Sequence, residues 1–256
     1  MLVIYTDFGI GPYTGQVKAV LCRQAPGVPV IDLACDAPSC NPQASAYLLA
    51  ALLEPIPQDA VVLGVVDPGV GNDHRKPVIV NVDGRWFVGP DNGLFSVVAM
   101  RGRELNCWDV EWLPAHLSAS FHGRDLFAPL AARLARGGDP PGQERRPADL
   151  VGNDWPADLH QIIYIDYFGN AVTGVRASSV AAGARVSVGG ITLPRACTFS
   201  DVPAGGGFCY KNAFGLLEIA VNCGRADAVF SVGIGDAVDV MDQGQVACSA
   251  KSSRNE

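Results

Sequence analysis

The sequence predicts an α/β protein with a smaller, mainly β domain at its C-terminal end, and three observations support this class. An apolar strand at residues 2–5 leads through a polar loop into a helical stretch at 16–23, which is how an α/β unit opens. Residues 61–66 are mostly aliphatic and lack polar alternation, the pattern of a strand that is buried on both faces. Beyond residue 157, short apolar runs separated by tight turns predict a mainly β domain.

The other elements expected in the first domain are further strands and helices. They are strands at 28–33, 78–82 and 85–88, and helices at 44–53, 94–101 and 126–135. Asp83-Gly84 separates two of these β-rich runs, and this dipeptide is a strong signal for the two-residue turn of a β-hairpin. The sequence therefore predicts a hairpin within the first domain.

The stretch 137–156 differs from its surroundings, because it is rich in glycine, proline and charged residues. Such a composition is typical of a connection between domains, and Arg145-Arg146 within it are expected to form a solvated loop. We therefore place an N-terminal α/β domain at 1–156 and a C-terminal domain at 157–256. The strands expected in the second domain lie at 162–165, at 185–188, at 191–193 and, as short strands with tight turns, within 229–240.

Composition excludes several classes of protein. The chain has 256 residues, 48% hydrophobic and 18% charged, with a net charge of −7, which argues against a nucleic-acid partner because phosphate binding needs clustered Lys and Arg. No apolar run approaches the roughly 18 residues of a membrane span and no signal peptide is visible, so we expect a cytoplasmic protein without membrane contact. The eight cysteines are scattered, which predicts buried thiols in a reducing compartment, and no metal-ligand spacing occurs, so we expect no metal.

Two aspartates directly follow predicted strands. Asp7 follows the first strand, and Asp67 ends the 61–66 run and is succeeded by Pro and Gly, then by His74 and Arg75. If both strands belong to one parallel sheet, both carboxylates emerge at the edge where such sheets bind ligands. The alternative is that each aspartate caps a turn or the next helix. For Asp67, with His74 and Arg75 close behind it, a functional role is favoured.

Two further clusters carry groups suited to chemistry. His122 precedes a glycine and opens a helix; it can exchange a proton near neutral pH, or it can be a structural hydrogen-bonding group. Asp166, Phe168 and Asn170 follow a predicted strand and offer a carboxylate, an aromatic face and an amide. That set suits a ligand with an ammonium group and a heteroaromatic base, and the alternative is an ordinary β-turn.

Taken together, six motifs resemble one family in the same order along the chain. The sequence resembles the S-adenosyl-L-methionine (SAM) hydroxide adenosyltransferases, relatives of the SAM-dependent fluorinase and chlorinase, from residue 2 to about residue 240. The motifs are Thr6-Asp7-Phe8-Gly9, Val65-Val66-Asp67-Pro68-Gly69-Val70-Gly71, Gly89-Pro90-Asp91-Asn92-Gly93, Phe121-His122-Gly123-Arg124-Asp125, Asp166-Tyr167-Phe168-Gly169-Asn170 and Asn212-Ala213-Phe214-Gly215-Leu216-Leu217-Glu218-Ile219-Ala220.

The resemblance implies an N-terminal α/β/α sandwich, a C-terminal β-barrel-like domain, and a homotrimer with active sites between neighbouring subunits. It implies that Asp67 and His122 belong to an Asp-Arg-His set that positions and activates water. The family arginine comes seven residues after the aspartate, where this sequence has His74. Either Arg75, which follows immediately, fills that role, or His74 has replaced the arginine and water activation is altered; we assign the role to Arg75.

The resemblance also implies the substrate contacts. Asp7 matches the residue that holds the ribose hydroxyls, Asp166 the partner of the methionine ammonium, and Phe168 and Asn170 residues around the adenine. Ala213 replaces a family serine near the methionine carboxylate, so one hydroxyl contact is lost. The full substrate-binding set implied is Asp7, Phe8, Asp166, Phe168, Asn170, Asn212 and Phe214.

The activity implied is hydrolysis of SAM to adenosine and L-methionine by attack of activated water on ribose C5′, with SAM as substrate and no cofactor. The halogenases lack the Asp-Arg-His set, which favours hydroxide over halide. Two alternatives stay open: halide attack on the same carbon, and a protein that binds SAM or adenosine without turnover. The second is kept open by His74 and Ala213.

Overall fold

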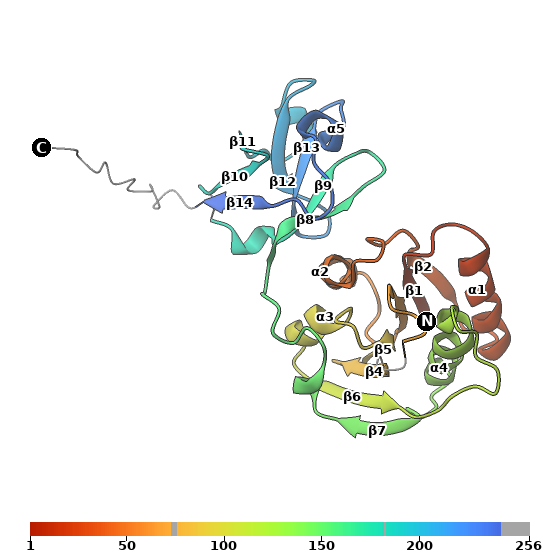
Figure 1. Cartoon of the computed structure of the whole chain (residues 1–256). Coiled ribbons are helices and arrows are strands. Elements are labelled where there is room, and N and C mark those ends of the chain that lie inside the picture. Colours follow the sequence, from red (N-terminus) through yellow and green to blue (C-terminus); the bar gives the residue numbers. More distant parts are fainter. Residues whose placement is uncertain (73–75, 182, 242–256) are drawn as a thin grey trace, which may run out of the picture. The chain divides into compact units, whose positions relative to one another are not determined.

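A computed structural model describes residues 1–72, 76–181 and 183–241, which form two compact units that divide between Leu159 and His160 (Figure 1). The sequence placed the boundary at 156/157. None of the helices in these described ranges is long and apolar enough to cross a membrane.

The N-terminal unit is built on a seven-stranded sheet of order β2-β1-β3-β5-β4-β6-β7. Strand β1 pairs in parallel with β2 and β3, β3 pairs in parallel with β5, and β4 pairs antiparallel with β5 and β6. The strands are β1 (Leu2–Thr6), β2 (Val30–Ala34), β3 (Val61–Val65), β4 (Pro77–Val82), β5 (Arg85–Pro90), β6 (Leu105–Val110) and β7 (Gly142–Arg145).

Helices cover both faces of this sheet, which confirms the predicted α/β class (Figure 1). They are α1 (Pro12–Gln24), α2 (Pro42–Leu52), α3 (Ser96–Arg101), the π-helical turn η1 (Gly123–Phe127) and α4 (Ala128–Ala135). In β1, Leu2 and Ile4 pack with residues of α1 and α4, whereas Val3 and Tyr5 pack with residues of α2 and α3. Successive side chains of a strand point to opposite faces, so a sheet covered on both sides needs uninterrupted apolar strands.

The stretch 137–156 corrects the expectation of a plain connection. Residues Gly142–Arg145 form β7, which pairs antiparallel with β6 at the edge of the sheet, and a 3-10 turn, η2 (Pro147–Asp149), follows. The prediction of a solvated loop is wrong for Arg145, whose side chain is 13% exposed. It fits Arg146, whose side chain is 82% exposed. Composition indicated a linker because strand pairing with β6 is a long-range contact that local sequence does not report.

The C-terminal unit is mainly β, as predicted. Its described strands form a three-stranded sheet, β11-β10-β14, and a four-stranded sheet, β12-β13-β9-β8. The elements are β8 (Leu159–Ile165), β9 (Ala171–Arg176), η3 (Ala177–Ser179), β10 (Arg185–Val188), β11 (Ile191–Leu193), η4 (Phe199–Asp201), β12 (Gly207–Lys211), β13 (Leu216–Val221), α5 (Ala226–Phe230) and β14 (Val238–Met241). Within these residues the two sheets do not close, so barrel-like closure stays a prediction.

Two smaller expectations are wrong. The start of the 229–240 segment lies in helix α5 rather than in a strand. Most of the described cysteines are not buried: Cys107 and Cys209 are, Cys35 is half-buried, and the exposed ones are Cys22, Cys40, Cys197 and Cys223. All seven are free thiols; of the four exposed ones, Cys22 lies in α1, and Cys40, Cys197 and Cys223 lie in turns or bends outside the helices and strands.

Candidate active site

The carboxylates of Asp7 and Asp67 emerge at the same edge of the N-terminal sheet, as predicted from the strand ends. Strands β1 and β3 run parallel, with Thr6 opposite Val65 in the register. Each aspartate also serves its local turn: Asp7 Oδ2 accepts a hydrogen bond from the Cys40 N–H at 3.0 Å, and Asp67 Oδ1 accepts one from the Gly69 N–H at 3.1 Å. Both aspartates therefore cap backbone and occupy the edge where parallel sheets bind ligands.

A cavity of about 300 Å³ brings Asp67 together with His122. His122 lies directly before η1, a π-helical turn of a kind that is frequent at functional sites. Leu117, Leu126 and Phe127 contribute apolar wall to this cavity, and Glu111 lies on its lining as well. A carboxylate and an imidazole that share a partly apolar hollow can orient a water molecule and accept its proton.

Phe8, which follows Asp7, packs against the segment that carries His122. Its ring meets that of Phe121 edge to face, with centroids 5.8 Å apart and planes at 75°. A Cβ atom on Gly123 would lie 2.9 Å from the Phe8 ring, so only glycine fits beside His122 here. Phe8 thus sets the position of the segment that carries His122.

Arg124 and Asp125 fasten the same segment. Arg124 Nε donates to Asp125 Oδ1 at 2.6 Å, and the guanidinium lies 4.9 Å above the Phe121 ring. The hydrogen bond from Arg124 lowers the pKa of the Asp125 carboxyl, which also accepts from the Ser118 N–H at 3.0 Å. Arg124 and Asp125 therefore form an ion pair that fixes the segment after His122, and the pairing keeps the Asp125 carboxylate ionised.

The C-terminal unit has a cavity of about 610 Å³, and it collects all five residues that the sequence predicted for this half. These are Asp166, Phe168, Asn170, Asn212 and Phe214. Phe168 is 70% exposed and Phe214 is 43% exposed, which leaves their rings accessible for stacking with a planar base. Asp166 accepts hydrogen bonds from the Asn170 backbone N–H at 2.8 Å and from Asn170 Nδ2 at 2.9 Å.

Sequence reasoning missed Glu218 and Tyr210 on the floor of this cavity. Glu218 is 4% exposed and accepts hydrogen bonds from Tyr210 Oη at 2.5 Å and from Asn212 Nδ2 at 2.8 Å. Burial raises the pKa of the Glu218 carboxyl and of the Tyr210 phenol. The signal was a lone glutamate inside the apolar run of β13, a strand buried along its whole length.

The side chain of Asn212 forms hydrogen bonds with the backbone of its own turn. Its Oδ1 accepts from the Phe214 N–H at 2.9 Å and from the Leu216 N–H at 3.0 Å, while Nδ2 is directed at Glu218. The side chain is buried, and its hydrogen bonds fix the loop that carries Ala213 and Phe214. Asn212 therefore shapes the cavity through the backbone that it orders.

This architecture matches one protein family over both units. The SAM hydroxide adenosyltransferase N-terminal domain matches residues 2–143, and the SAM hydroxide adenosyltransferase C-terminal domain matches residues 160–239. The chain belongs to the SAM hydroxide adenosyltransferase family.

Relatives within the family are similar over most of their length. The (R)-S-adenosyl-L-methionine hydrolase of Thermus thermophilus is 40% identical over 241 residues, which is 86% of this chain and 91% of the relative. The protein of the same name from Salinispora arenicola is 35% identical over 252 residues, 92% of this chain and 95% of the relative.

Two crystal structures are similar to this chain. That of an uncharacterized conserved protein from Thermotoga maritima has a TM-score of 0.83 and 30% identity, covering 94% of this chain and 100% of that one. That of a conserved hypothetical protein from Thermus thermophilus has a TM-score of 0.76 and 36% identity, covering 94% and 99%.

The water-activating roles of Asp67, His122 and Arg75 all stay predictions from the resemblance. His74 and Arg75 lie outside the described residues, so the choice between them rests on the sequence alone. No group of three or more His, Cys, Asp or Glu side chains that could hold a metal ion occurs among the residues described.

Proposed function

We propose that this protein hydrolyses S-adenosyl-L-methionine to adenosine and L-methionine. The observation that carries the proposal is the cavity shared by Asp67 and His122, in a chain similar over most of its length to proteins named as hydrolases of this substrate. Because those relatives are named for the (R) compound, we propose that the (R) epimer at sulfur is the preferred substrate.

The reaction needs a water molecule held in line with the C5′–S bond and a group that accepts its proton. The sulfonium leaves as a neutral thioether, so no general acid and no cofactor are required. Water attacks ribose C5′ from the face opposite sulfur; the new O–C5′ bond forms as the C5′–S bond breaks, and its electron pair goes to sulfur. The attacking water loses one proton, which His122 or Asp67 accepts, and orientation by these groups supplies much of the rate. By resemblance, Arg75 is assigned to stabilise the developing hydroxide.

The C-terminal cavity supplies the chemistry that the rest of the substrate needs. The Asp166 carboxylate suits the methionine ammonium, and the exposed faces of Phe168 and Phe214 suit the adenine. Asn170 is assigned to the adenine edge, and Asp7 to the ribose hydroxyls. The sulfonium is a pyramidal centre with three different carbon substituents. Only one epimer can therefore place ammonium, adenine and an in-line C5′–S bond correctly at the same time.

The experiment separates water attack from halide attack and from binding alone. Purified (R) and (S) epimers are incubated separately with the protein in water labelled with heavy oxygen, and products are resolved by chromatography and mass spectrometry. We expect adenosine carrying the label at its 5′-hydroxyl, formed faster from the (R) epimer. A 5′-halo-5′-deoxyadenosine at high chloride, or tight substrate binding without product, would overturn the proposal.

Variants assign the reaction to the cavity. Asp67→Asn keeps the oxygen that caps Gly69 but removes the charge, and we expect its rate to fall by about 10²–10⁴-fold, with a similar loss for His122→Gln. Asp154→Asn removes an exposed carboxylate of the same unit and serves as the matched control, with a rate within about twofold of wild type.

We further infer a homotrimer with active sites between neighbouring subunits, as the family resemblance implies. Sedimentation equilibrium measures the assembly. Co-expressing the Asp67→Asn and Asp166→Ala chains tests the shared site: if neighbours contribute these residues, mixed trimers regain some sites with both aspartates intact. Activity no higher than that of the two separate variants would contradict shared sites.

A further inference from the structure

The stretch Gly89-Pro90-Asp91-Asn92-Gly93 spans the end of β5 and the turn after it. It has no role in the proposed chemistry, yet it contacts the catalytic segment twice. Asn92 Nδ2 donates to the carbonyl oxygen of Val66 at 2.8 Å. The backbone N–H of Asp91 donates to the carbonyl oxygen of Lys76 at 3.0 Å. The adjacent residues Asp91 and Asn92 thus hydrogen-bond to the backbone on both sides of the Asp67 segment, at Val66 before it and at Lys76 after it.

The orientation of the Asn92 amide is set by a second contact. Its Oδ1 accepts from the Leu94 N–H at 3.3 Å, which leaves Nδ2 directed at Val66. The Val66 carbonyl belongs to the peptide group that also contains the Asp67 N–H. Fixing that carbonyl therefore fixes the peptide plane from which the Asp67 side chain projects.

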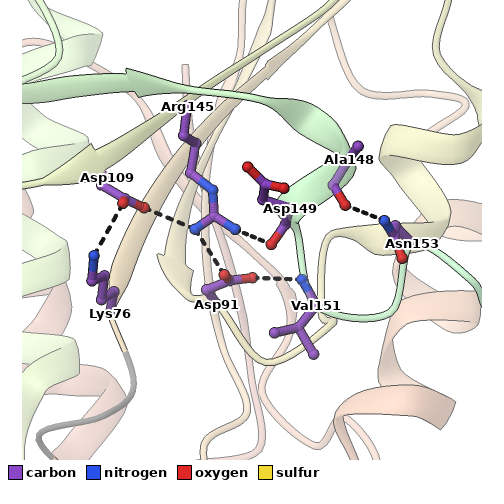
Figure 2. A network of polar contacts seen from close by, with 8 residues as sticks. All are labelled: Lys76, Asp91, Asp109, Arg145, Ala148, Asp149, Val151 and Asn153. Atoms are coloured by element: carbon purple, nitrogen blue, oxygen red, sulfur yellow. Dashed lines mark hydrogen bonds and ion pairs between the residues drawn. The ribbon is translucent and has the colours of Figure 1, made fainter.

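Asp91 is itself anchored by a polar network (Figure 2). Its carboxylate accepts from the Val151 N–H at 3.1 Å and pairs with Arg145 Nη1 at 2.8 Å; the Asp91 side chain is 11% exposed. Arg145 also pairs with Asp109 at 2.8 Å, and Asp109 pairs with Lys76 Nζ at 3.3 Å. Both the backbone and the side chain of Lys76 are therefore tied to this network.

The turn also has little freedom to move. A Cβ on Gly89 would lie 2.1 Å from the carbonyl oxygen of Gly64 in β3, so the turn approaches the strand that carries Asp67 as closely as glycine permits. Gly93 adopts a φ of +94°, and a Cβ there would lie 2.3 Å from the Trp155 ring.

From these contacts we infer that Asp91, Asn92 and Arg145, which we call the loop bracket, are positioning residues that hold Asp67 in its catalytic geometry. They act through the backbone of Val66 and Lys76 and are not among the residues assigned to contact the substrate. A displacement of about 1 Å in a catalytic group can cost about 10²-fold in rate, so a clamp on the adjoining peptide has a large effect on turnover. The inference rests on the proposed hydrolysis.

The test compares two asparagines that make the same kind of bond. Asn92→Ala removes the donor to Val66, and we expect kcat for adenosine formation to fall by about 10–100-fold while KM changes by less than about threefold. Adenosine binding, measured by calorimetry, stays within about threefold, because none of the assigned substrate contacts is changed. The matched control is Asn153→Ala, since Asn153 Nδ2 also donates to a carbonyl, that of Ala148, away from the catalytic segment. This variant keeps its kcat.

A second variant covers the case in which Asn92→Ala does not fold. Asp91→Asn preserves shape and the contact to Val151 but removes the charge that pairs with Arg145, and we expect a fall in kcat of at least about threefold with KM unchanged. Values of kcat within twofold of wild type in the folded variants, or a KM that rises in proportion to the loss, overturn the inference. Absence of adenosine formation by the wild type instead overturns the proposed function.

Discussion

The substitution Gly93→Ala gives a stability test whose magnitude follows from two separate features of the structure. Gly93 has a φ of +94°, a conformation that costs an L-residue about 1–2 kcal/mol. The new methyl group would lie 2.3 Å from Trp155 Cη2, and forcing this half-buried ring aside costs about 1–3 kcal/mol. We expect a combined loss of about 2–5 kcal/mol, a fall in Tm of roughly 4–20 °C for a unit of this size.

The assay reads the N-terminal unit alone. All four tryptophans, Trp86, Trp108, Trp112 and Trp155, precede residue 160, so tryptophan fluorescence during urea unfolding reports on that unit. Gly137→Ala is the matched control, because Gly137 has a φ of +79° and no atom lies within 4 Å of the position that an alanine methyl group would take there. It should lose only the backbone contribution, about 1–2 kcal/mol.

A double-mutant cycle isolates the steric contribution. In a Trp155→Ala background the ring is gone, so Gly93→Ala should cost about 1–3 kcal/mol less than it does in the wild type. The reasoning is refuted if Gly93→Ala costs no more than Gly137→Ala and if its cost is the same with and without Trp155.

Two further predictions concern charge. Arg145→Ala leaves Asp91 and Asp109 without the half-buried arginine that they share and should destabilise the N-terminal unit by about 1.5–3 kcal/mol. Arg146→Ala, at an 82% exposed side chain, should change the free energy of unfolding by less than about 1 kcal/mol in the same urea titration. Equal losses for the two arginines would contradict the network. Burial raises the folded-state pKa of Glu218 above its ordinary value of 4.5, so its contribution to stability is fully present below that pH and is lost as pH rises through the folded pKa. Glu218→Gln should remove this loss. The free energy of unfolding of the variant, relative to that of the wild type, should therefore rise with pH across that window when urea unfolding is followed by circular dichroism. Parallel pH curves for the two proteins would contradict this.

Local chemistry was enough to predict the strand ends that matter most. The uninterrupted apolar runs predicted β1 and β3, and the polar residues directly after them located Asp7 and Asp67. The Asp83-Gly84 hairpin is also confirmed, with a φ of +51° and of +90° at the two turn residues and antiparallel pairing of Val82 with Arg85. These features depend on the period of a strand and on the conformations open to a few residues, which neighbouring sequence determines.

The burial of charge could not be predicted in this way. Arg145 looked like half of a basic pair in a linker, but β7 pairs with β6 and places its guanidinium between two aspartates from distant segments. Glu218 looked like one polar residue in a strand, but it is buried along with the rest of β13 and lines the C-terminal cavity. Both outcomes depend on which elements pack over a position.

The sequence by itself determined the fold class, the strand ends that carry the aspartates and, through ordered motifs, the family. Only the tertiary structure decided that Asp67 and His122 line one cavity, and that Asp91 and Asn92 form hydrogen bonds with the backbone on either side of the Asp67 segment. The physical reason is how far apart along the sequence the interacting residues lie. Strand periodicity and turn conformations are set by neighbouring residues, whereas a shared cavity or a hydrogen bond from Asn92 to Val66 exists only after the sheet has brought separate strands side by side.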